Sequence, residues 1–292
     1  MNLSPVKIVE CPRDAMQGLH HFIPTEVKAA YLNRLLKVGF DVLDAGSFVS
    51  PKAIPQMKDT ADVFRQLDLS TTSTKLLAII ANIRGGEDAV QFDEVSYLGF
   101  PFSISETFQQ RNTNSSIEQS LQTVMKLHDL VLQKNKELVV YISMAFGNPY
   151  GDPWSADVAA GWVEKIASLG IKTIALADTV GVASTNDISN LFKTLIPRFP
   201  GVEIGAHLHT TALNWTSKVE AAYAAGCRKF DTALKGYGGC PMADDELVGN
   251  LATENLVEYL KGKSEPLNLD MKEFQNALNM ANSVFNPVPQ PD

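Results

Sequence analysis

Two histidines, His207 and His209, stand one residue apart in the stretch IGAHLHTTALNW. The stretch begins like a β-strand, and alternate side chains of a strand project from the same face, so both imidazoles are expected on one face about 6 to 7 Å apart along the chain. Two imidazoles so placed could hold a divalent metal. The pair alone does not decide the matter, because two polar side chains on a solvated strand face have the same spacing.

Further polar residues stand where other apolar segments end. Arg13 and Asp14 follow VKIVEC, and Asn250 lies in the loop after the last predicted strand. One carboxylate, two imidazoles and one amide oxygen, but no thiolate, are thus offered by Asp14, His207, His209 and Asn250. Such a set favours Mg²⁺ or Mn²⁺ over structural zinc and leaves positions open for substrate oxygens. The alternative is that Asp14 only pairs with Arg13 or another cation.

Two residues of this group could act on a reacting molecule. The planar guanidinium of Arg13 suits a carbonyl oxygen that becomes negative during a reaction, although a structural ion pair would also explain this residue. Cys240 lies in GYGGCP, whose glycines predict a loop that can open and close, and a thiol above the site could transfer a proton. Taken alone, the motif is better explained by a glycine-rich turn with an incidental cysteine.

The elements that must position these residues alternate along the whole chain. Eight apolar segments predict strands, and amphipathic segments with Ser or Thr at the start and Gly at the end separate them. The predicted strands are VKIVEC, DVLDAGS, KLLAIIA, EVSYLGF, ELVVYISMA, IKTIALAD, VEIGAHLH and KFDTAL. The pattern predicts an α/β fold with a single (β/α)₈ TIM-barrel domain over about residues 6–262 and a short C-terminal extension over about 263–292. A doubly wound open sheet is the alternative, but no glycine-rich fingerprint follows the first strand.

In a barrel of this kind the carboxyl ends of all strands meet at one rim, where the active site lies. The polar residues named above fall at that rim. Asp44 and Ser47 of the second predicted strand, and Asp178 and Thr179 at the end of the sixth, fall there too. We therefore expect all of them to face one site.

Composition excludes several classes of protein. The 292 residues carry a formal net charge of -8 with no basic cluster, which argues against nucleic acid as a partner. The sequence MNLSPVKIVECPRDAM does not look like a leader, and no apolar run approaches the roughly 18 residues that span a membrane, so a cytoplasmic protein is expected. Cys11 and Cys227 lie at positions where small buried hydrophobes are expected.

Several stretches, in this order, closely resemble the 3-hydroxy-3-methylglutaryl-CoA lyase family of metal-dependent TIM-barrel enzymes. They are VECPRDAMQ, SFVSPKAIPQM, SETFQQRN, ADTVGV, HLH and KGYGGCPMADDELVGNLATENL. The resemblance runs from about Val6 to about Leu260. The SFVSPK run and the GGCP loop distinguish this family from related acyltransferases and ketoacid aldolases, which share mainly the Arg-Asp and HxH elements.

The resemblance implies a carbon–carbon lyase that cleaves 3-hydroxy-3-methylglutaryl-CoA to acetoacetate and acetyl-CoA with Mg²⁺ or Mn²⁺. It makes Arg13 and Cys240 catalytic. It places Gln17 and Asp44 in the substrate pocket, Asp178 in the polar shell of the site, and Glu254 just after the last ligand. The implied metal ligands are Asp14, His207, His209 and Asn250. An acyl-CoA is the implied partner, and the resemblance is compatible with a homodimer.

The chain departs from the family pattern at several places. Ala15 replaces the usual Gly after Arg-Asp, His20 stands where many members have Lys, and Thr210 replaces the usual Asp after HxH. These changes bear on contacts with the acyl group and CoA, so a related 3-hydroxyacyl-CoA or a ketoacid is the alternative substrate. A non-catalytic barrel that keeps a metal for stability or partner binding is a third interpretation, but it does not account for Arg13 and Cys240.

Overall fold

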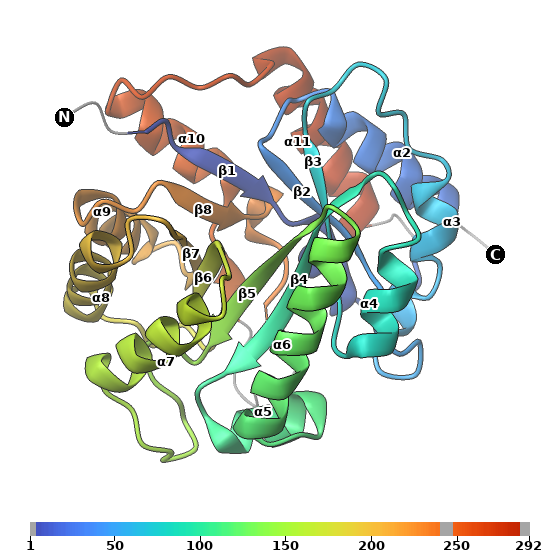
Figure 1. Cartoon of the computed structure of the whole chain (residues 1–292). Coiled ribbons are helices and arrows are strands. Elements are labelled where there is room, and N and C mark those ends of the chain that lie inside the picture. The colour runs from blue at the N-terminus through green and yellow to red at the C-terminus, as the bar shows by residue number, and fades with distance from the viewer. Residues whose placement is uncertain (1–3, 240–247, 287–292) are drawn as a thin grey trace.

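Eight parallel strands close into a barrel in the computed structural model, which describes residues 4–239 and 248–286 (Figure 1). The strands pair in chain order, and the β1–β8 pairing closes the ring. All eight strands expected from the sequence are present, which confirms the TIM barrel. They are β1 (Lys7–Glu10), β2 (Val42–Ser47), β3 (Lys75–Ile79), β4 (Val95–Ser103), β5 (Glu137–Ser143), β6 (Thr173–Asp178), β7 (Glu203–Thr210) and β8 (Lys229–Thr232).

A two-residue strand, β9 (Gly249–Asn250), pairs antiparallel with the end of β7. The register sets Asn250 opposite His209 and Gly249 opposite Thr210. Asn250 therefore reaches the rim from a strand and not from the loop that the sequence predicted. The segment that carries it is fixed by backbone pairing to the strand of the two histidines.

Helices surround the barrel (Figure 1). Ser116, Ser155 and Ser184 accept a hydrogen bond from a backbone N–H of the first turn of the helices that follow them, as expected for helix N-caps. The α-helices are α1 (Pro12–Gln17), α2 (Thr25–Leu36), α3 (Thr60–Phe64), α4 (Ile83–Ala89), α5 (Glu106–Thr113), α6 (Ile117–Gln133), α7 (Ala156–Ser168), α8 (Thr185–Arg198), α9 (Trp215–Ala224), α10 (Thr253–Gly262) and α11 (Met271–Phe285). Two 3₁₀ helices, η1 (Pro55–Met57) and η2 (Leu234–Gly236), lie in loops.

The barrel interior is filled by alternate strand residues. One cluster of buried side chains comprises Val9, Cys11, Val42, Leu77, Val139, Tyr141 and Ala175. A second, larger core lies between the strands and the helices. Cys11 and Cys227 are both buried free thiols, which confirms that they pack as small hydrophobic side chains.

The C-terminal helix α11 packs against α2 (Figure 1). The rings of Tyr31 and Phe285 meet edge to face at 5.8 Å between centroids, and Arg34 pairs with Glu273 at 2.6 Å. The extension is thus joined to the barrel by aromatic contacts and an ion pair. None of the helices in the described part of the chain has the length and apolar character needed to cross a membrane.

Candidate metal centre and active site

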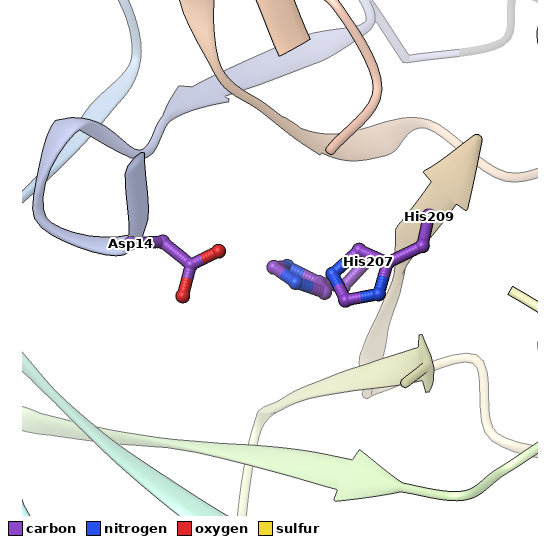
Figure 2. Close-up of side chains that lie close together, drawn as sticks. All are labelled: Asp14, His207 and His209. Carbon is purple, nitrogen blue, oxygen red and sulfur yellow. The ribbon is translucent and has the colours of Figure 1, made fainter. Parts of the chain in front are cut away.

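Three side chains that the sequence placed at the rim converge in the structure. Asp14, His207 and His209 offer ligand atoms that lie within 4.8 Å of one another (Figure 2). Ligands on opposite sides of one ion, with bonds of about 2.0 to 2.6 Å, would be about 4 to 5 Å apart. The spacing therefore fits ligands of a single metal ion.

Asp14 reaches the cluster from a helix and not from a strand end, which corrects the expectation from the sequence. Strand β1 ends at Glu10, and Pro12 begins helix α1. Proline is favourable there because the N–H group of the first helical residue has no partner within the helix. Asp14 lies in the first turn of that helix. Figure 2 shows its carboxylate pointing toward the two imidazoles, which come from the end of β7.

His209 is held in one tautomer. Its Nδ1 lies 2.9 Å from the carbonyl oxygen of Thr179, which can only accept, so Nδ1 carries the proton. Burial, with the nearby His207 adding to it, lowers the pKa of His209 to about 4. The ring is therefore neutral near pH 7, and Nε2 has a free lone pair. That atom is buried and has no hydrogen-bond partner among the described residues.

His207 is oriented by a carboxylate that the sequence analysis did not single out. Its Nδ1 lies 3.2 Å from Asp231 of β8, whose other oxygen accepts from Lys229 at 3.1 Å. Burial alone would lower the pKa of His207, but the bond to Asp231 outweighs it and the pKa is raised. The Asp231 contact uses Nδ1, so Nε2 is the nitrogen of His207 left to bind a metal.

Asp14 is ionised because of its neighbours. Burial favours the neutral acid, but the guanidinium of Arg13, 2.9 Å away, outweighs it and lowers the pKa of Asp14. Gln17 Nε2 donates to Oδ1 at 3.0 Å, and Asn250 Nδ2 donates to Oδ2 at 2.7 Å. Asn250 thus joins the cluster, with its amide nitrogen and not its oxygen facing Asp14.

Arg13 is almost fully engaged. Its Nε and Nη2 donate to Asp44, with Nη2 2.5 Å from the carboxylate, and Nη1 donates to Asp14 and to Gln17. A guanidinium has five N–H groups, and these contacts leave one hydrogen of Nη2 for another acceptor. Asp44 and Gln17 therefore orient Arg13, and both ion pairs and a substrate contact are compatible with this arrangement.

The remaining predicted site residues differ in where they point. Ser47 and Thr179 lie at the rim, where Ser47 Oγ donates to Ile79 O and Thr179 Oγ1 accepts from the Met144 N–H. Asp178 does not join the cluster. Its carboxylate accepts from Lys218 of α9 at 2.5 Å and from the Ala183 N–H at 3.0 Å, on the helix side of β6. Contact of Asp178 with a substrate stays a prediction, and these bonds hold its carboxylate on the helix side.

The predicted catalytic thiol, Cys240, lies outside the described residues.

Tyr141 of β5, which the sequence analysis did not single out, lies beside the cluster in the barrel interior. Its ring meets that of His207 edge to face at 5.9 Å, and its hydroxyl is buried without a hydrogen-bond partner among the described residues. The sequence contains an indication of this position, because Tyr141 stands two residues after Val139 and so shares the inward face of the strand. The prediction of the strand did not specify which of its faces points inward.

Comparisons with known proteins agree with this architecture. A sequence model of the family described as HMGL-like matches residues 6–281. The mitochondrial hydroxymethylglutaryl-CoA lyase of Mus musculus is 34% identical over 260 residues, 88% of this chain and 78% of that protein, and the lyase of Bacillus subtilis is 30% identical over 91% of this chain and 88% of its own.

Solved structures are also similar. An HMG-CoA lyase from Acinetobacter baumannii in complex with coenzyme A and 3-methylmalate has a TM-score of 0.88 and 28% identity, covering 99% of this chain and 98% of that chain. Hydroxymethylglutaryl-CoA lyase from Pseudomonas aeruginosa has a TM-score of 0.90 and 29% identity, covering 99% and 96%.

Proposed function

Because the chain belongs to the HMGL-like family, we propose that it is a divalent-metal-dependent carbon–carbon lyase that cleaves 3-hydroxy-3-methylglutaryl-CoA to acetoacetate and acetyl-CoA. The observation that carries the proposal is the buried Nε2 of His209, which has no hydrogen-bond partner in the described part of the chain and lies beside Asp14 and His207. A buried polar atom without a partner is costly in a folded protein unless a ligand satisfies it. The substrate is assigned from the lyase relatives, and the relative solved with coenzyme A supports an acyl-CoA as the substrate class.

The residues present fit a divalent metal. His209 as a neutral imidazole and Asp14 as an ionised carboxylate are in the protonation states that metal ligands need. Asp231 orients His207, and because it also raises the pKa of this imidazole, a bound metal would displace a proton from His207 at low pH. Asn250 completes the set if its amide turns its oxygen inward. We propose Mg²⁺ or Mn²⁺, because the set holds oxygen and nitrogen ligands but no thiolate. The bound ion supplies Lewis acidity, which makes the tertiary hydroxyl of the substrate easier to deprotonate.

Arg13 acts on the thioester. Cleavage removes the hydroxyl proton, turns the C–O bond into the ketone of acetoacetate, and leaves the electron pair of the broken C–C bond in the enolate of acetyl-CoA. The Nη2 hydrogen of Arg13 that no described residue accepts is the donor for the enolate oxygen, and the Asp44 and Gln17 contacts fix its direction before the reaction begins. A contact that strengthens as negative charge develops lowers the barrier without tightening substrate binding equally.

Cys240 is proposed to transfer the proton that the enolate takes up at carbon. The unperturbed pKa of a thiol, about 8.5, lies near working pH, and a nearby positive charge lowers it further. Ser47 and Thr179 are proposed to line the pocket beside the reacting groups. Tyr141 adds a hydroxyl donor in the barrel interior, next to His207.

Two measurements on the purified protein test the proposal. Metal-free protein, prepared with a chelator, should release no acetyl-CoA from 3-hydroxy-3-methylglutaryl-CoA, and Mg²⁺ or Mn²⁺ should restore release. Full activity without metal would refute the role of the Asp14, His207 and His209 cluster. Metal-dependent cleavage of another 3-hydroxyacyl-CoA or of a ketoacid, with no cleavage of this substrate, would instead refute the substrate assignment.

A further inference from the structure

A cavity opens at the end of the barrel opposite the metal cluster. It has a volume of about 180 Å³. Its walls include the first residues of six strands, which are Lys7, Val42, Lys75, Thr173, Glu203 and Lys229. The metal cluster lies after the end of β1 and at the end of β7, so the two sites occupy opposite mouths of one barrel.

The charged groups around the cavity differ in whether they already have a partner. Three lysines and two carboxylates line it, and two of the lysines already have partners. Lys7 pairs with Glu203 at 2.6 Å, and Lys229 pairs with Asp231, deeper in the barrel, at 3.1 Å. Lys75 forms no ion pair with any of the described residues, which leaves one ammonium group at the mouth free to bind a ligand.

The carboxylates of the cavity are less available than this ammonium group. Asp41 accepts a hydrogen bond from the Ile8 N–H at 2.8 Å, and Glu203 is held by Lys7. The hydroxyls of Tyr97 and Thr173 add further donors to the lining. Both carboxylates of the lining thus already accept a hydrogen bond, whereas the ammonium group of Lys75 has no partner among the described residues, which favours an anionic ligand at this lysine.

The inner wall of the cavity is apolar. Val42, Leu77 and Val139 belong to the hydrophobic cluster inside the barrel and form its floor. The cavity has room for several water molecules, and therefore for a ligand of a few non-hydrogen atoms. A short hydrocarbon chain fits this floor, and an anionic head fits the lysine at the mouth.

We propose that the amino-terminal mouth of the barrel binds a small aliphatic carboxylate. Lys75 holds the carboxylate, assisted by the Tyr97 and Thr173 hydroxyls, and the hydrocarbon chain lies on Val42, Leu77 and Val139. Ligand sites of barrel enzymes lie at the other end of the strands, so this site is distinct from the one proposed for catalysis. It does not depend on the metal or on the lyase reaction.

Isobutyrate is a suitable probe, and NMR titration of the metal-free protein measures its affinity without any use of activity. Lys75→Ala should weaken binding about ten-fold or more, as expected for the loss of a charge-assisted hydrogen bond. Lys193→Ala is the matched control, because Lys193 is an exposed lysine of α8 away from the cavity, and it should leave the affinity unchanged. Lys75→Arg should retain most of the binding.

Charge reversal gives an independent arm. Lys75→Glu changes the lining from three ammonium groups and two carboxylates to two and three, so it should abolish isobutyrate binding and allow isobutylammonium to bind instead. Equal isobutyrate affinity in wild type and Lys75→Ala would place the ligand elsewhere and overturn the proposal. Tighter binding of valine than of isobutyrate would also overturn it, because the ligand would then need an ammonium group of its own.

Discussion

Replacement of Asp231 by Asn tests how the protein prepares His207 for a metal. The carboxylate accepts from His207 Nδ1 on one oxygen and from Lys229 on the other, and its side chain is fully buried. Asn has the same shape but keeps only one acceptor oxygen. It can serve His207 or Lys229, and its amide N–H₂ then faces the other donor.

Two losses of different size follow. Removal of the carboxylate that orients a metal-binding histidine costs about 10- to 100-fold in metal affinity. Lys229 is buried and loses its counterion, and breaking a buried ion pair from one side destabilises a protein by about 3 to 5 kcal/mol. The two effects separate in the double variant Asp231→Asn/Lys229→Met, which should recover much of the stability but none of the metal affinity.

Calorimetric titration with Mn²⁺ measures the first loss, and urea unfolding of the metal-free protein measures the second. Asp178→Asn is a closely matched control. Asp178 is also a fully buried carboxylate paired with a lysine, Lys218, but it touches neither imidazole. It should lose stability and keep its metal affinity. Unchanged Mn²⁺ affinity in Asp231→Asn, or an equal loss in both variants, would refute the role assigned to Asp231.

Three further predictions concern other buried or reactive groups. Arg13→Lys should lower kcat about 10²-fold with less change in substrate binding, because a point charge cannot keep the contacts to Asp44 and Gln17 while donating to an enolate; unchanged kcat would make Arg13 structural. Cys240→Ser should keep metal binding but lose about two to four decades of turnover in steady-state kinetics. Burial raises the pKa of Glu10 from 4.5 to about 8, so between these values the folded protein holds a proton that the unfolded chain releases, and stability falls as pH rises. Urea unfolding at pH 5.5 and 8 should show wild type losing about 3 kcal/mol relative to Glu10→Gln, and parallel behaviour of the two would contradict the buried neutral acid.

Much of the fold and part of the site followed from local sequence pattern. The alternation of apolar and amphipathic segments is a local property, and it was enough to find the eight strands and their order. Period-two alternation likewise placed His207 and His209 on one face, where the structure has them. The rule that strand ends meet at one rim brought Asp14 to the same place, although a helix turn carries it.

The partners of these residues depended on register between strands. Asp231 supports His207 because β7 and β8 pair with these two residues opposite each other, and no single segment contains that information. The outward direction of Asp178 can, in contrast, be predicted from its own strand. Ala175 belongs to the interior cluster, so Ala177 also faces inward and Asp178, one residue on, faces the helices.

Lys229, Asp231 and His207 form a chain of polar contacts between β7 and β8. This chain explains why a polar site is stable in an apolar barrel. Gly205 has no side chain at the level where Lys229 must pass, and a Cβ there would lie 3.2 Å from the aliphatic carbons of that lysine. Lys229 can therefore extend along the barrel to Asp231. Burial would otherwise raise the pKa of Asp231, but the ammonium of Lys229 outweighs it and the carboxylate stays ionised. An ionised Asp231 accepts a hydrogen bond from His207 Nδ1 and so leaves Nε2 for the metal. The lack of a side chain at Gly205 therefore contributes, through Lys229 and Asp231, to the orientation of a metal-binding histidine.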